Sequence, residues 1–179
     1  MSSHYTKASW LVAPLAMALM IHAHAQTPPT TTPATTKMSS ADRSFINKAA
    51  QGGMAEVELG KLAAQRASDP QVKQFAQRMV DDHSKANDKL KQVASSKSIT
   101  LPTDLPSDVK REEDKLNKLS GTQFDKEYMN HMMSDHKKDA SLFKSGAKSK
   151  DPDVAQFASE TLPTIEQHLQ LAQSIAKSK

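Results

Sequence analysis

From Ser39 onward, apolar residues recur at intervals of three and four, which is the period of an α-helix. No stretch alternates apolar and polar residues as a half-buried strand does. The pattern therefore predicts an all-α domain. Long helices are expected over residues 41–66, 70–96, 122–145 and 152–176, and a short helix over residues 108–119.

Start and stop signals support these bounds. Asp-Pro pairs at 69–70 and 151–152 supply an N-cap residue followed by a proline suited to the first helical turn. The octapeptides that begin with these pairs are similar to each other, which predicts pseudo-two-fold halves. Pro102 and Pro106 interrupt the chain after the second long helix, and Gly146 is expected to end the third in a left-handed conformation.

The lengths of the connections predict how the helices pack. Short connections before the second and fourth long helices make each of them an antiparallel neighbour of the helix before it. The middle connection, of about 25 residues, can recross the bundle and holds the short helix. We therefore expect a ferritin-like four-helix bundle with one long crossover. The first long helix should pack against the third, and the second against the fourth.

The first 25 residues have the pattern of a secretory signal peptide. A basic start with Lys7 is followed by an apolar run from Trp10 to Ile21 and by the cleavage motif Ala23-His24-Ala25. The apolar run is shorter than the roughly 20 residues that cross a bilayer, so no transmembrane anchor is expected after cleavage. The sequence predicts an exported protein, periplasmic or secreted.

The mature chain should begin at Gln26 with a segment unlike the rest. Residues 26–38 are mostly Thr and Pro, a composition typical of a disordered linker. The bundle domain is expected to occupy residues 39–179.

Composition excludes several functions. The chain has no cysteine, which removes disulfides, thiolate metal sites, iron–sulfur clusters and cysteine nucleophiles. Removal of Lys7 with the signal leaves 23 basic and 20 acidic residues, a net charge of +3 that is scattered rather than clustered, so no nucleic-acid partner is expected. No Gly-rich phosphate loop is present, and Ser84 lies about 100° around the helix from its neighbour His83, which gives no support for nucleophilic catalysis.

Three histidines fall on the apolar stripes of separate helices, namely His83, His136 and His168. Each lies about 13 to 16 residues from the start of its helix, as does Glu56, so all four should meet at mid-bundle. Glu58, by contrast, is expected to face water. One carboxylate and three imidazoles would suit a divalent transition-metal ion such as zinc, iron or copper.

Three further acidic residues lie beside these positions and are candidates to hold the ligand side chains in place or to bind the ion themselves: Asp82, Asp135 and Glu166. His131, five residues before His136, is expected at the surface. Ion pairing of the histidines with neighbouring carboxylates would explain the same pattern without a metal ion. The methionines at helical spacing are more simply core residues than copper ligands.

Several segments together resemble a known family. They are Ala49–Gly60 (AAQGGMAEVELG), Phe75–His83 (FAQRMVDDH), the pair Asp135-His136, and Thr161-Leu162-Pro163 followed by His168. Over residues 40–176 the chain resembles an uncharacterised bacterial family of exported or outer-membrane-associated proteins with a ferritin-like domain of unknown function. The resemblance implies fold and compartment, and no activity.

The chain departs from di-iron ferritins, which place Glu-x-x-His on two helices. Val80 and Ile165 stand three residues before His83 and His168, which argues against ferroxidase or iron-storage chemistry. Two hypotheses stay open: an exported bundle with a mid-bundle metal site, and an interaction or stress-protective module without one. A redox metalloenzyme would also need an open coordination position. The sequence leaves a protein partner or a homo-oligomer open.

Overall fold

The computed structural model describes residues 38–177. Within that range the chain forms helices and no strand, so the predicted all-α class is confirmed. The helices are α1 (Ser40–Arg66), α2 (Pro70–Ser96), α3 (Ser107–Asn117), α4 (Gly121–Gly146) and α5 (Pro152–Lys177). The predicted signal peptide and all of the predicted linker except Met38 lie outside the described residues. Met38 is partly buried against the bundle.

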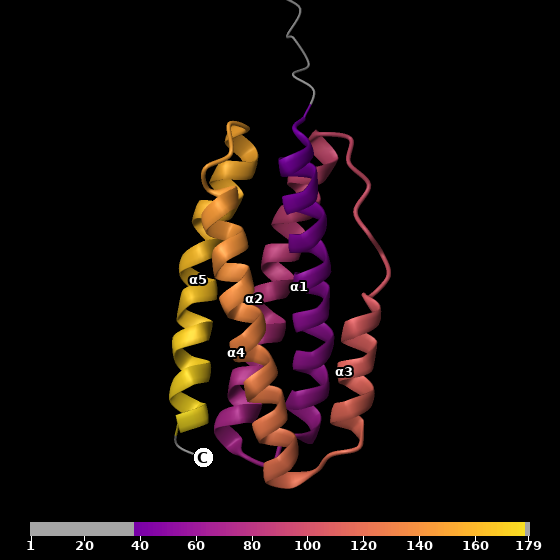
Figure 1. Ribbon diagram of the computed structural model, residues 1–179, viewed down its shortest axis with the longest axis vertical. Coiled ribbons are helices and arrows are strands. Elements are labelled where there is room, and N and C mark those ends of the chain that lie inside the picture. Colours follow the sequence, from indigo (N-terminus) through magenta and orange to yellow (C-terminus); the bar gives the residue numbers. More distant parts are fainter. Residues whose placement is uncertain (1–37, 178–179) are drawn as a thin grey trace, which may run out of the picture. The chain divides into compact units, whose positions relative to one another are not determined.

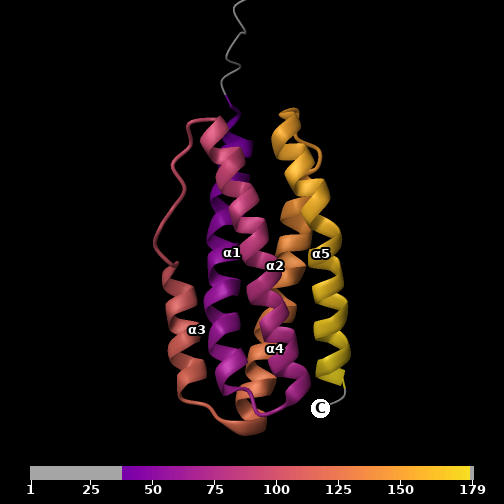
Figure 2. The same cartoon turned by 180° about the vertical axis from the view of Figure 1, so that it is seen from behind.

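The helices form two antiparallel hairpins, α1 with α2 and α4 with α5 (Figure 1). The hairpins pack with α1 against α4 and α2 against α5, as expected. The crossover descends outside α1 and carries α3 beside α1 (Figures 1 and 2). Helix α3 also contacts α4. The ferritin-like connectivity is therefore confirmed. None of the described helices is both long and apolar enough to cross a membrane.

Local chemistry explains the helix starts. The Ser39 side chain accepts a hydrogen bond from the Asp42 amide at 3.0 Å, which caps α1. The Asp69 side chain accepts one from the Gln71 amide at 2.6 Å, with Pro70 as the first residue of α2.

The expected left-handed cap at Gly146 is wrong. Among the described glycines only Gly121 has a positive φ, 56°. Gly146 is instead covered by the Phe45 ring, and a Cβ at this position would come within 2.5 Å of a ring carbon. Close packing of α4 against α1 therefore requires this glycine.

The apolar core is divided into two clusters by a polar layer. One cluster holds Leu59, Phe75 and Met132, and the other holds Ile46, Leu90 and Ile165. Each long helix contributes residues to both clusters, and between them it carries one buried polar side chain. These side chains are Glu56 on α1, His83 on α2, His136 on α4 and His168 on α5. Burial of such groups disfavours folding unless they find partners, so the layer needs a chemical explanation.

Candidate metal centre

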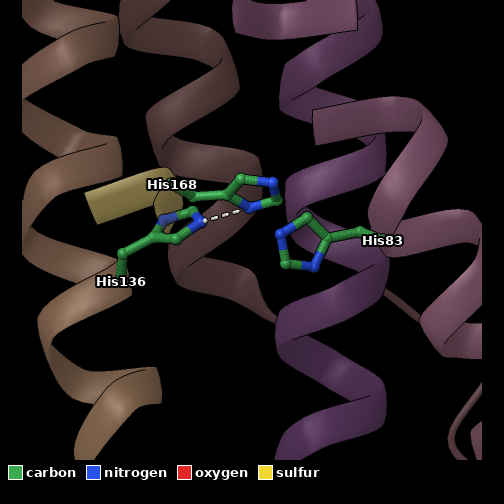
Figure 3. A group of neighbouring side chains, drawn as sticks. All are labelled: His83, His136 and His168. Carbon is green, nitrogen blue, oxygen red and sulfur yellow. Dashed lines mark hydrogen bonds between the residues drawn. The ribbon is translucent and has the colours of Figure 1, made fainter. Parts of the chain in front are cut away.

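Three imidazoles converge in the middle of the bundle, from α2, α4 and α5 (Figure 3). His83, His136 and His168 are 5%, 0% and 1% exposed. Each offers one ring nitrogen, and these nitrogens all lie within 4.8 Å of one another. The shared height expected from counting along the helices is present in the structure.

The outer nitrogen of each ring faces an oxygen acceptor. Nδ1 of His83 lies 2.8 Å from Oε2 of Glu56, and Nε2 of His168 lies 3.0 Å from Oδ2 of Asp82. Nδ1 of His136 lies 3.0 Å from the Met132 carbonyl oxygen and 3.4 Å from Oε1 of Glu56. A carbonyl or carboxylate oxygen can only accept, so in a neutral ring each outer nitrogen carries the hydrogen.

The inner nitrogens then carry lone pairs directed at one another. Figure 3 shows Nε2 of His136 facing Nδ1 of His168, at 3.3 Å, with a nitrogen of His83 turned toward both. That nitrogen is Nε2, because Nδ1 of His83 binds Glu56. Nε2 of His83 is buried and has no hydrogen-bond partner among the described residues.

Burial keeps all three rings neutral. It lowers the pKa of His83 to about 4 and that of His168 to about 4, and it also lowers the pKa of His136. Only a neutral imidazole can bind a metal ion, so at neutral pH the inner nitrogens are ready to act as ligands. Two nitrogens that bind the same tetrahedral zinc ion at about 2.0–2.1 Å lie about 3.3–3.4 Å apart, which matches the contact between His136 and His168.

A carboxyl pair supports the layer from the α1 side. Burial raises the pKa of Glu56, and burial together with the nearby Glu56 raises the pKa of Asp139 to about 8. Oε1 of Glu56 is buried and has no hydrogen-bond partner among the described residues, and Nδ1 of His136 lies 3.4 Å from it. A proton on Asp139 supplies a donor for Glu56, so the pair shares one proton at neutral pH.

Sequence reasoning missed Asp139. It stands three residues after His136, and residues three apart on a helix lie on neighbouring positions of one face. That spacing was the available signal.

Two of the acidic candidates lie away from the histidine layer. Asp135 contacts His131 and Lys138, at 2.8 Å each. Burial by itself would raise the pKa of Asp135, but these two partners outweigh burial and lower the pKa to about 2. Glu166 is 42% exposed and pairs with Lys144 at 2.8 Å. In the structure Glu56 and Asp82 therefore contact the three histidines, whereas Asp135 and Glu166 pair with other side chains.

Two expectations about exposure had different outcomes. Glu58 is exposed and pairs with Lys61, as expected. The expected surface position of His131 is wrong, because its side chain is only 20% exposed, with Glu112 of α3 lying 3.8 Å away. Helix α3 covers this part of α4, which the periodicity of α4 by itself does not reveal.

The fold and the layer define a four-helix bundle with a buried three-histidine centre. The chain belongs to the family of the domain of unknown function DUF4142, which matches residues 27–175. Membership of an uncharacterised family is thus confirmed. The chain has no match among curated proteins.

Solved structures share the fold. A DUF305 fragment from Deinococcus radiodurans matches with a TM-score of 0.70 and 11% identity, over 79% of this chain and 98% of that one. CopM in its Cu(I)-bound form matches with a TM-score of 0.65 and 15% identity, over 76% and 96% of the two chains. CopM in an Ag-bound form obtained by co-crystallization has a TM-score of 0.64 and 15% identity, over the same shares. At these identities the likeness concerns the fold alone.

Proposed function

We propose that this protein is an exported module that binds one transition-metal ion between His83, His136 and His168. The observation that carries the proposal is the inward direction of three lone pairs in a buried layer. Glu56 and Asp82 hold the outer nitrogens of His83 and His168, and such partners fix the orientation of metal-binding imidazoles.

Copper is the ion that the centre suits best, with zinc next. Imidazole nitrogens bind both ions well. The Cu(I)-, Cu(II)- and Ag-bound forms of CopM, which has the same fold, support copper over zinc. Iron sites typically combine histidines with an inward carboxylate. Here Glu56 and Asp82 contact the outer nitrogens, which disfavours iron.

Export rests on the signal peptide predicted over residues 1–25, with the mature chain in the periplasm or the medium. Mass spectrometry of the full-length gene product after expression in a bacterial host would test it. The expected product begins at Gln26 and is recovered outside the cytoplasm. A chain that keeps Met1 and stays in the cytoplasm would contradict this part of the proposal.

Metal binding can be measured on the untagged mature chain after treatment with a chelator. Cu(I), Cu(II), Zn²⁺ and Ag⁺ are added separately, and bound metal is counted after desalting. We expect one ion per chain and a higher Tm, because a ligand that binds only the folded state stabilises it. At a free-ion concentration of about 100 times Kd the gain is about 2.7 kcal/mol.

Two variants locate the ion. The double variant His83→Ala/His136→Ala should lose both the stoichiometric ion and the rise in Tm. The matched control His131→Ala removes a histidine from α4 that faces Glu112 and Asp135 instead, and it should keep both. The absence of any ion-dependent rise in Tm, or an equal rise in the double variant, would leave a module in which the histidines only join helices.

A further inference from the structure

The three histidines are buried, so an ion needs a route to them. A small cavity of about 10 Å³ lies beside His83, with room for about one water molecule. Glu56, Asn87 and Asp139 also line it. Nε2 of His83, a nitrogen on a side chain only 7% exposed, has no hydrogen-bond partner among the described residues.

One surface groove lies between α1, α3 and α4 and shares two lining residues with this cavity. It has a volume of about 460 Å³, and Glu56 and Asp139 line both hollows. Asp108 and Asp135 add two carboxyl groups to its walls, against the two ammonium groups of Lys48 and Lys138. Lys138 is paired with Asp135 at 2.8 Å. Because Glu56 and Asp139 share one proton, the lining carries three negative charges against two positive ones, and this net negative charge favours cations.

A second groove, of about 300 Å³, lies between α1, α2 and the crossover. It shares only Asn87 with the cavity, and its walls are mainly apolar, with Lys91 and no carboxyl group. The Asn87 carboxamide fills the space left by Gly53, where a Cβ would lie 2.0 Å from Oδ1 of Asn87. A neighbouring groove on this side, which Asn87 also lines, includes Glu58 and Asp88. The packed carboxamide of Asn87 closes this side, and no carboxyl group of either groove also lines the cavity.

We propose that the metal ion enters and leaves through the groove between α1, α3 and α4, and that Asp139 passes it from the groove to the histidines. The inference rests on the proposed function and concerns the exchange of the same ion. Asp139 belongs to both hollows and offers a carboxyl oxygen between the solvent and His83. In this role it controls rates and is not one of the three ligands.

The test measures rates of Zn²⁺ binding and release for the mature chain by stopped-flow exchange with a coloured zinc indicator. Gly52→Leu places a bulky side chain in the groove next to Asp139, since a Cβ at Gly52 lies 3.6 Å from Oδ1 of Asp139. Asp139→Leu replaces the carboxyl group by an apolar one. A blocked route slows entry and exit alike, so we expect both rates to fall about tenfold or more while Kd changes less than about threefold.

Control variants separate the two grooves. Thr103→Leu narrows the other groove, which the exposed Thr103 lines, and it should leave both rates unchanged. Gln65→Leu adds the same side chain as Gly52→Leu at an exposed position of α1, and it should behave like the unaltered chain. Circular dichroism establishes that each variant is folded. Should Gly52→Leu destabilise the bundle, Asp139→Leu carries the test.

Failure of the proposed route and failure of the proposed metal site would give different results. If the unaltered chain binds Zn²⁺ and its rates are the same in both groove variants, or if only Thr103→Leu lowers them, the route is wrong and the metal site stands. If the folded, unaltered chain binds no Zn²⁺, Cu(I) or Ag⁺, the proposed function itself fails, and the route fails with it.

Discussion

Nε2 of His136 and Nδ1 of His168 face each other at 3.3 Å in a layer between two apolar clusters. The other nitrogen of each ring is already engaged, with the Met132 carbonyl and with Asp82. This contact is therefore satisfied only by an extra proton or a metal ion between the rings. Burial lowers the pKa of His168 to about 4, so at neutral pH a metal ion suits the contact better than a proton.

Replacing His136 by leucine should separate metal binding from structural support. The backbone carbonyl of Met132 remains in the helix, and an apolar group of similar size at a fully buried position removes the facing lone pairs. We expect the metal-free variant to be as stable as the original chain or about 1 kcal/mol more stable, with loss of the ion-dependent rise in Tm. Urea denaturation with and without the ion measures both. A loss of several kcal/mol without metal would favour a purely structural role.

Asp82→Asn should weaken metal binding without abolishing it. The carboxylate of Asp82 holds Nε2 of His168 at 3.0 Å, and loss of such a partner commonly lowers metal affinity by about 10- to 100-fold. Competition with a chelator of known affinity gives the change in Kd. Asp81→Asn is the matched control, since Asp81 is exposed and bonds to Gln77. Equal affinities for the two variants would contradict the role of Asp82.

The stability of the metal-free chain should depend on pH through Asp139. Its pKa is about 8 in the folded chain against 3.8 ordinarily, so its contribution to folding is fully present below pH 3.8 and is lost as pH rises through about 8. The side chain introduced by Asp139→Asn does not titrate. The free energy of unfolding of this variant should therefore rise relative to that of the original chain by several kcal/mol between pH 4.5 and 9.

Asp135→Asn should give a different pH profile because the pKa of Asp135 is shifted the other way, to about 2. Its contribution is fully present above pH 3.8 and is lost only as pH falls through about 2. Between pH 4.5 and 9 this variant should differ from the original chain only through His131, whose pKa Asp135 raises. The original chain loses the stability of that pair as pH rises through the raised pKa of His131. A flat difference for Asp139→Asn over the same range would show that Asp139 is ionised in the folded chain.

Replacing Gly52 and Gly146 by alanine should change the stability of the fold in opposite directions. Gly52 lies inside α1, and a Cβ there makes an ordinary 3.6 Å contact, so Gly52→Ala should raise the free energy of unfolding by about 0.5–1 kcal/mol. Gly146→Ala would bring a Cβ within 2.5 Å of the Phe45 ring and should lower the free energy of unfolding by about 1–3 kcal/mol. Thermal or urea denaturation of the two variants checks the signs.

Much of the candidate site could be predicted because it depends on distances along single helices. The helical period places His83, His136 and His168 on buried stripes, and the fixed rise per residue brings them to one height with Glu56. The burial of His131 was beyond this reasoning, and the spacing of Asp139 from His136 did not reveal its partner Glu56. Their surroundings come from α1 and α3, whose lateral contacts with α4 are not encoded in the period of α4.

The sequence by itself determined the helices, their order and the depth of the polar layer, because capping residues, periodicity and connection lengths act locally along the chain. Only the tertiary structure decided which nitrogen of each ring turns inward, that Asp82 and Glu56 hold the outer ones, and that Asp135 and Glu166 lie elsewhere. Those outcomes depend on the rotation of each helix about its axis and on the side chains of its neighbours. These are set by packing between residues far apart in the sequence.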